Sequence, residues 1–194
     1  MPKLEFFYDY ASPFSYLADT QIPALAERTG AEVAYRPMLL GAVLQATGNS
    51  PPANVAAKAR YMLVDLQRWA EHYGVAFHWN PVFPQRTLGA LRGALVAIEE
   101  GCFESYHGAA FRAIWVEKRD LSDASVLRDL FARAGLDPER GLERSSAQEI
   151  KDRLRENTDE AVRRGAFGAP TFFVGEQMFW GNDRLLFVEK ALRS

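Results

Sequence analysis

Residues 4–15 read LEFFYDYASPFS, and this stretch decides the fold. The apolar and aromatic run over 4–10 is typical of a buried strand, and residues 11–13 interrupt it. From Pro13 onward, apolar residues recur at helical spacing until Gly30, where a helix is expected to end. Proline suits the first turn of that helix, because the N–H that it lacks has no intrahelical partner there. The stretch therefore predicts a strand that leads directly into a helix.

Further strands are predicted on either side of a long helical region. Residues 32–36 alternate in polarity before Pro37, so the chain opens strand-helix-strand, with a connection long enough for parallel pairing. Near the other end, 169–174 and 177–180 read APTFFV and QMFW around a Gly-Glu turn, which predicts a β-hairpin. A last helix is expected from Leu185.

The order of these elements predicts the fold class. It is β-α-β, then a large all-helical insertion, then β-β-α, which is the order of an α/β thioredoxin-like fold. We expect a thioredoxin-like domain over residues 1–38 and 166–194, and a helical insertion domain over 39–165.

Composition narrows the classes of function. The chain has 194 residues, a formal net charge of -2 and no basic cluster, which argues against a nucleic-acid partner. A single cysteine, Cys102, excludes an internal disulfide and a dithiol redox cycle. The histidines, His72, His78 and His107, lack the spacing of a metal site, so no metal is expected. No segment predicts a membrane span or a signal peptide, and we expect a cytoplasmic protein with no membrane partner.

The first candidate for chemistry is Ser12, within the sequence Ser-Pro-Phe-Ser at the start of the predicted helix. The amino end of a helix offers unpaired N–H groups and a partial positive charge, which stabilise an anion. A redox protein would place a cysteine thiolate there, but serine occupies both cysteine positions of a Cys-x-x-Cys motif. The Ser12 hydroxyl can instead donate a hydrogen bond to a thiolate from another molecule. The alternative is that Ser12 is an ordinary N-cap.

Two later junctions are candidates for binding a peptide. Pro170 opens a strand and, if its bond to Ala169 is cis, the Ala169 backbone would face a ligand strand; the alternative is an ordinary proline at a strand start. Gly181 permits unusual backbone angles before Asn182 and Asp183, which suit the amino-acid end of a γ-glutamyl peptide. Their alternative is a simple helix cap.

Four ordered segments carry a family resemblance. They read FFYDYASPFSYLA over 6–18, YMLVDLQRWAEHYGV over 61–75, FGAPTFFV over 167–174 and MFWGNDRL over 178–185. Together they resemble the 2-hydroxychromene-2-carboxylate isomerases, which are relatives of the kappa-class glutathione transferases in the DsbA-like thioredoxin superfamily. The resemblance runs along the whole chain. It implies glutathione as cofactor, a small aromatic substrate and a homodimer.

The resemblance implies roles for individual residues. Ser12 corresponds to the serine that contacts the glutathione sulfur, and Ala169, with Pro170, to the backbone that pairs with the cysteinyl part. Asn182 and Asp183 correspond to binders of the γ-glutamyl end.

Two positions of the insertion are assigned in the same way, and a third departs from the family pattern. Asn54 and Lys58 correspond to a segment that contacts glutathione or substrate. Leu63 departs from the pattern, since an isomerase of this family carries lysine there, and this leaves the exact aromatic substrate open.

Aromatic residues predict a substrate cleft between the insertion and the thioredoxin-like part. Its candidate contacts are Phe14, Trp69 and Trp115, with Trp79 and Trp180 as further candidates, and the resemblance implies that Phe83 and Arg92 lie near the substrate channel. Tryptophans, however, more commonly belong to a core, and Arg92 has an ion pair with an acid as its alternative. We expect Phe103 and Tyr106 to be exposed, where they leave room for a dimer interface. Cys102 is expected to take no part.

The function predicted from these features is a glutathione-dependent isomerase. It would interconvert 2-hydroxychromene-2-carboxylate and trans-o-hydroxybenzylidenepyruvate, in aromatic hydrocarbon catabolism, by transient addition of the thiolate. Two alternatives stay open. One is a kappa-like glutathione transferase that releases a stable conjugate, and the other is a thioredoxin-like module that binds glutathione or peptides without catalysis. A disulfide oxidoreductase is disfavoured by the missing Cys-x-x-Cys motif.

Overall fold

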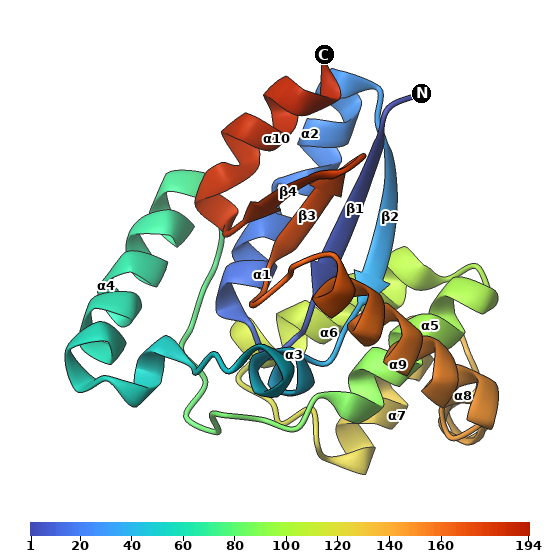
Figure 1. The fold of residues 1–194 in the computed structure, drawn as a ribbon. Coiled ribbons are helices and arrows are strands. Elements are labelled where there is room, and N and C mark those ends of the chain that lie inside the picture. The colour runs from blue at the N-terminus through green and yellow to red at the C-terminus, as the bar shows by residue number, and fades with distance from the viewer.

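A computed structural model of the chain describes residues 1–194 and shows one four-stranded sheet with helices around it (Figure 1). The strands lie in the order β2-β1-β3-β4. The central strand β1 (Lys3–Tyr8) pairs in parallel with β2 (Glu32–Pro37) and antiparallel with β3 (Thr171–Val174). The hairpin partner of β3 is β4 (Gln177–Trp180). The predicted strands and their thioredoxin-like order are confirmed.

Helices make up most of the remaining chain, and every element between residues 39 and 165 is helical. They are α1 (Pro13–Asp19), α2 (Ile22–Thr29), α3 (Leu40–Thr47), α4 (Ala56–Tyr73), α5 (Leu88–Glu99), α6 (Phe103–Trp115), α7 (Ala124–Arg133), α8 (Pro138–Ser145), α9 (Gln148–Arg163) and α10 (Leu185–Leu192), with short 3-10 helices η1 (Pro52–Asn54) and η2 (Asn182–Arg184). None of these helices is long and apolar enough to cross a membrane.

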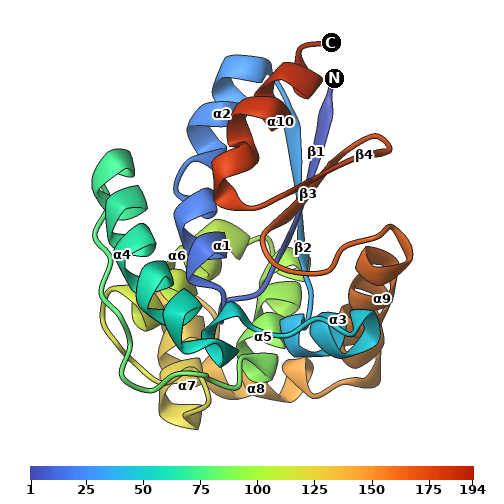
Figure 2. The same cartoon turned by 60° about the vertical axis from the view of Figure 1, so that its left-hand side comes forward.

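The two faces of the sheet are covered by different helices. Side chains alternate along β1, so Phe6 and Tyr8 enter the larger hydrophobic cluster while Phe7 enters a smaller one. The larger cluster includes residues of α1, α2 and α10, and the smaller includes Val43 of α3 and Ala161 of α9. Figure 2 shows α1, α2 and α10 on one side of the sheet and α9 on the other.

The larger cluster continues from the sheet into the insertion. Its 32 buried residues include Leu4 of β1 together with Leu91 of α5, Phe111 and Trp115 of α6 and Leu154 of α9. The helical insertion and the thioredoxin-like part therefore share one hydrophobic core.

The first predicted helix is divided into α1 and α2. The periodicity from Pro13 to Gly30 suggested a single helix, but the structure interrupts it at Thr20 and Gln21. The cause is Pro23, in the first turn of α2, because proline has no N–H to donate to the carbonyl four residues earlier. Only 7 residues of α1 therefore lie behind Ser12, which makes the helix dipole at that corner weaker than the sequence suggested.

One expectation about the insertion is wrong. Tyr106 is fully buried, with its hydroxyl donating to the carbonyl of Ala90, and Phe103 is partly buried against Tyr35. Tyr106 is therefore not available to a dimer interface.

Candidate functional site

Ser12 joins two segments that are far apart in the sequence. As the N-cap of α1 it accepts a hydrogen bond at Oγ from the Ser15 N–H, at 3.1 Å. The same hydroxyl donates to the carbonyl oxygen of Ala169, at 3.0 Å. The side chain is 4% exposed. Ser12 is therefore a cap, as its alternative interpretation held, and it is also the direct contact between the first helix and the segment before β3.

The Ala169-Pro170 segment has a cis peptide bond and an unused donor. The Ala169 carbonyl accepts from Ser12, whereas the Ala169 N–H donates to no group of the chain. The Pro170 carbonyl accepts from the N–H of Gly181, at 3.0 Å, so the turn after β4 is fixed to the same segment. Three stretches that the sequence singled out separately thus meet at one end of the sheet.

Asn182 and Asp183 lie very differently at this end. Asn182 is only 3% exposed, and its carbonyl accepts from the Tyr73 hydroxyl of α4, at 3.2 Å. Asp183 is exposed and forms an ion pair with Arg184. Gly181 has φ 101°, and a Cβ there would lie 2.5 Å from Asp183 Oδ1, so a side chain would collide with that carboxylate. The turn therefore presents Asp183 to solvent and keeps Asn182 inside.

An aromatic rim borders the Ala169 segment. The Trp180 ring packs 4.9 Å from that of Phe167, and a Cβ on Gly168 would lie 2.6 Å from Trp180 Nε1. The Asn49 side chain donates to the Phe167 carbonyl at 2.8 Å, which brings the loop before η1 to the same rim. This contact was missed by sequence reasoning, because a lone asparagine beside Ser50 and two prolines indicates only a loop.

Asn54 and Lys58 follow this loop on η1 and the first turn of α4. Both are exposed, and neither side chain forms a hydrogen bond or ion pair within the chain. They are therefore free to contact a ligand near the rim, and their assignment stays a prediction.

Asp9 is a buried carboxylate that sequence reasoning also missed. It is 2% exposed and accepts from the Ala11 N–H at 2.9 Å, the Leu40 N–H at 2.8 Å and the Thr87 hydroxyl at 2.5 Å. Burial raises the pKa of the Asp9 carboxyl, and these hydrogen bonds oppose the rise. Its signal in the sequence is an acid between two tyrosines, at the end of an apolar strand. Asp9 connects the loop that carries Ser12 to the starts of α3 and α5.

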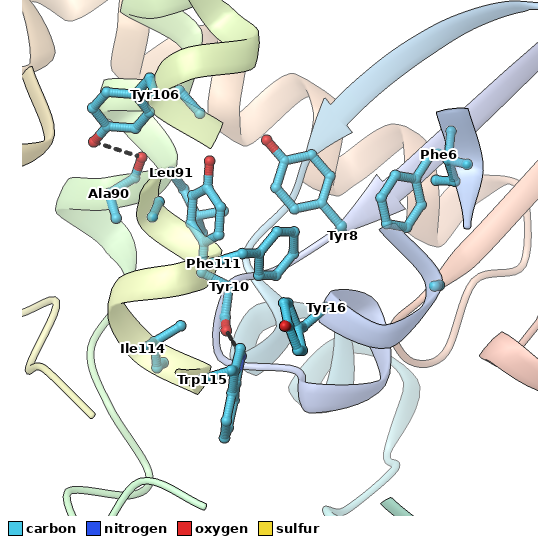
Figure 3. Close-up of a cluster of buried hydrophobic side chains, with 14 of the residues drawn as sticks. Phe6, Tyr8, Tyr10, Tyr16, Ala90, Leu91, Tyr106, Phe111, Ile114 and Trp115 are labelled. Carbon is cyan, nitrogen blue, oxygen red and sulfur yellow. Dashed lines mark hydrogen bonds between the residues drawn. The ribbon is translucent and has the colours of Figure 1, made fainter. Parts of the chain in front are cut away.

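The aromatic residues of the insertion pack beneath that loop. The indole of Trp115 donates to the Tyr10 carbonyl at 2.9 Å, two residues before Ser12 (Figure 3). Phe83 lies 6.1 Å from the Trp115 ring, and its own ring is partly exposed. Trp115 has no exposed surface, so the prediction that it contacts substrate is wrong in this structure. Trp115 instead packs against the ring of Phe83, and its indole N–H holds the loop that carries Ser12.

The other predicted substrate contacts are dispersed. Phe14 of α1 and Trp69 of α4 are partly buried against the main core, and the Trp69 ring packs 5.2 Å from that of Tyr73. Arg92 of α5 forms no ion pair with an acid, so that alternative is wrong, and its Nε is buried without a hydrogen bond. Trp69 thus lies near the Asn182 end, and Phe83 near the Tyr10 end.

The remaining polar side chains do not form a metal site, since no group of three or more His, Cys, Asp or Glu residues is suitably placed. His107 is buried, with Nδ1 3.0 Å from the Tyr10 hydroxyl and Nε2 2.9 Å from Asp19 Oδ1, which confirms that its hydrogen bonds are satisfied. Burial raises the pKa of the Cys102 thiol, which disfavours a reactive thiolate there.

Comparison with known proteins groups the chain with one set of relatives. It is 37% identical to a 2-hydroxychromene-2-carboxylate isomerase of Sphingobium xenophagum and 34% identical to one of Pseudomonas putida, covering 97% of this chain in both and 97% and 93% of the relatives. It is 30% identical to glutathione S-transferase kappa 1 of Caenorhabditis elegans, over 100% of this chain and 92% of that one.

A solved structure agrees with this grouping. The structure of a 2-hydroxychromene-2-carboxylate isomerase superposes with a TM-score of 0.89 at 31% identity, covering 98% of this chain and 94% of the other. The profile described as a DSBA-like thioredoxin domain matches residues 3–193. The chain therefore belongs to the DSBA-like thioredoxin family and, within it, to the family of the 2-hydroxychromene-2-carboxylate isomerases.

Proposed function

We propose that this protein is a glutathione-dependent isomerase that interconverts 2-hydroxychromene-2-carboxylate and trans-o-hydroxybenzylidenepyruvate. The relatives named for this reaction span almost the whole chain. The observation that supports the proposal at the level of residues is the hydrogen bond from the Ser12 hydroxyl to the Ala169 carbonyl. It joins the side chain implied to bind the glutathione thiol to the backbone implied to bind its cysteinyl part.

The groups at this corner fit a cysteinyl peptide. The Ala169 N–H has no partner and the Ala169 carbonyl is held by a hydroxyl that can rotate. A cysteinyl residue offers a carbonyl, an N–H and a sulfur, which match the Ala169 donor, the Ala169 acceptor and the Ser12 donor. Exposed Asp183 suits the ammonium group of a γ-glutamyl end, and the exposed side chains of Asn54 and Lys58 are proposed to add polar contacts to the ligand.

Rotation of one hydroxyl switches the site from its free to its bound arrangement. In the free protein the Ser12 proton points to Ala169; beside a sulfur anion it turns to the sulfur, because a hydrogen bond to a charged acceptor is stronger. The released Ala169 carbonyl then accepts the peptide N–H. When bound, glutathione supplies a thiolate that adds to the conjugated carbon of the ring-opened substrate, permits rotation about the resulting single bond and leaves again. The Ser12 hydroxyl stabilises the anion before and after that event.

The aromatic part of the substrate has proposed contacts on α1 and on the insertion. Phe14, Phe83 and Trp69 offer partly exposed aromatic surface, and Arg92 offers a guanidinium without an acidic partner, suited to a carboxylate. Trp115 contributes only indirectly, because its ring packs against that of Phe83.

The variant Ser12→Ala tests the proposal. It removes the donor to sulfur, so the pKa of bound glutathione thiol should rise by about one unit and turnover should fall roughly 100-fold. The thiol pKa is read from the ultraviolet absorption of the thiolate during a pH titration, and turnover from the interconversion of the two substrate forms.

A matched control is Asp123→Ala, which removes the N-cap of α7. Both variants lose a capping hydrogen bond of similar strength, about 1 kcal/mol, but only Ser12→Ala should change the thiol. Equal thiol pKa values in Ser12→Ala and the unaltered protein would refute the role of Ser12. No uptake of glutathione by the unaltered protein, measured by calorimetry, would refute the function.

A kappa-like glutathione transferase is the second candidate, favoured by the relatives of that name at 30% and 26% identity. It would use the same site but release a stable conjugate. Mass spectrometry of the products separates the two activities, because the isomerase regenerates free glutathione. Binding without either product would identify the third alternative, a non-catalytic binding module.

We further propose a cytoplasmic homodimer that takes part in aromatic hydrocarbon catabolism. Exposed apolar side chains on α4 and α10, among them Tyr61, Leu186 and Phe187, offer surface for an interface in place of Tyr106. Sedimentation equilibrium would test the dimer by its mass.

A further inference from the structure

Ser15 has a buried hydroxyl without a partner. Its Oγ is shielded from solvent and forms no hydrogen bond, and the residue is 0% exposed. Native proteins satisfy most buried polar side-chain atoms, because an unsatisfied one costs about 1–3 kcal/mol. A serine in this state therefore needs an explanation, since alanine would fill nearly the same space without that cost.

The position of Ser15 relates it to Ser12. Ser12 is the N-cap of α1 and Ser15 is the third residue of that helix, a position whose N–H an N-cap side chain can accept. They are already in contact, because the Ser15 N–H donates to Ser12 Oγ at 3.1 Å. Ser12 is 4% exposed and Ser15 0%, so Ser15 has no surface that a ligand can reach.

A hydroxyl oxygen has one proton to donate and two lone pairs that accept. In the free protein Ser12 Oγ donates to Ala169 and accepts from the Ser15 N–H, which leaves one lone pair available. A second donor to that lone pair would polarise the Ser12 O–H and strengthen the bond that it makes outward.

We propose that Ser15 is a positioning residue of the glutathione site, whose hydroxyl donates to Ser12 Oγ when Ser12 donates to the bound sulfur. The two serines then form a short chain, from the Ser15 O–H to Ser12 Oγ and from the Ser12 O–H to the thiolate. The Ser15 hydroxyl makes no hydrogen bond in the free protein, so this contact requires the Ser15 side chain to turn toward Ser12 when the ligand binds. This inference rests on the proposed function and adds a second residue to its site.

The variant Ser15→Ala gives two opposite signatures. In the free protein it removes an unsatisfied hydroxyl, so Tm should rise by about 2–4 °C. In the complex it removes the donor behind Ser12, so the pKa of the bound glutathione thiol should rise by about half a unit. A more stable protein that holds a less acidic thiol is not expected from a residue with a purely structural role.

A double-mutant cycle tests whether Ser15 acts through Ser12. In the Ser12→Ala background, Ser15→Ala should leave the thiol pKa unchanged, because the acceptor of its hydroxyl is absent. The matched control is Ser145→Ala in α8, since Ser145 is also buried and its hydroxyl donates to the Gly141 carbonyl at 2.8 Å. That variant should lower Tm and leave the thiol pKa unchanged.

Several outcomes would overturn the inference. A fall in Tm of Ser15→Ala in the free protein would mean that the hydroxyl has a structural partner such as a buried water. An unchanged thiol pKa, with normal binding and with Ser12→Ala still effective, would refute the role of Ser15 alone. Additive effects in the cycle would place Ser15 on a route independent of Ser12. Failure of the unaltered protein to bind glutathione would overturn this inference and the proposed function together.

Discussion

Helices α4 and α5 follow each other in the chain and contribute in opposite ways. Helix α5 has 12 residues, of which 7 are buried, and it lies in the middle of the main core. Helix α4 has 18 residues, of which only Leu66 and Ala70 are buried, and it exposes Tyr61, Leu63 and Val64. Figure 1 shows α4 on the outside of the molecule.

This difference indicates that α5 contributes mainly to the stability of the fold and α4 mainly to the binding of ligands. Helix α5 supports the fold and, through Thr87 at its start, the buried carboxylate beside the Ser12 loop. Helix α4 contributes little to the core, but its Tyr73 holds the Asn182 turn and its first turn carries Lys58. We expect substitutions in α5 to act mainly on unfolding and those in α4 mainly on ligands.

The largest effect is expected from Leu91→Ala in α5. Leu91 is 0% exposed, so its truncation should leave a cavity and lower the free energy of unfolding by about 2–5 kcal/mol. The same truncation in α4, Leu63→Ala, should change it by less than about 0.5 kcal/mol, because Leu63 is 43% exposed. Urea denaturation measures both. Similar losses in the two variants would mean that α4 is part of the core in solution.

Thr87→Val should have the next largest effect, and one that depends on pH. It removes the hydroxyl that donates to Asp9 and leaves the shape of the side chain, at a cost of about 1.5–3 kcal/mol near neutral pH. The Thr87 hydrogen bond lowers the pKa of Asp9, so its loss raises further a pKa that burial has already raised.

The sign of the pH effect follows from linkage. Because folding raises its pKa, Asp9 binds a proton more readily in the folded than in the unfolded state. Its burial as a carboxylate therefore lowers the free energy of unfolding by the full amount above the folded pKa, and this loss of stability disappears as the pH falls toward the unfolded pKa. This loss of stability is larger in Thr87→Val, because the pKa of Asp9 is raised further there. The deficit of the variant against the unaltered protein should therefore shrink as the pH is lowered through the acid range, and a deficit independent of pH would show that Asp9 is not the group affected.

A smaller effect on stability than that of Thr87→Val is expected from Tyr73→Phe in α4. It deletes the hydroxyl that donates to the Asn182 carbonyl, so the free energy of unfolding should fall by about 0.5–1.5 kcal/mol. Glutathione should bind several-fold more weakly in calorimetry, because the Asn182–Asp183 turn loses its support. An unchanged affinity for glutathione would mean that α4 does not contribute to the binding site, which would contradict the role assigned to α4 in the comparison with α5.

Much of the fold could be predicted because its signals are local. Residues 4–15 contain a strand, a break and a capped helix, and the hairpin over 171–180 has its own turn. The division of α1 from α2 was missed, because the apolar periodicity continues across the break. Pro23 is the only residue of the sequence that indicates the start of a second helix. Burial was harder, because Tyr106 and Trp115 lie at helical positions whose neighbours come from distant segments.

The candidate site shows the same limit. Ser12 and Ala169 could each be selected by motif, yet their contact spans 157 positions and no local pattern reports it. Asp9, Asn49 and Tyr73 act through partners in other elements, so their roles appear only when the chain is folded.

The shared hydrophobic core has a consequence for chimeric proteins. Residues 39–165 look like a module that one relative might lend to another, but Leu91, Phe111 and Trp115 pack in one cluster with β1. A transplanted insertion would need to match the β1 surface of its host and also bring a hydroxyl for Asp9. Exchange of substrate preference between relatives is therefore better attempted by substituting the partly exposed contacts Phe14, Trp69 and Phe83 one at a time, without moving the insertion.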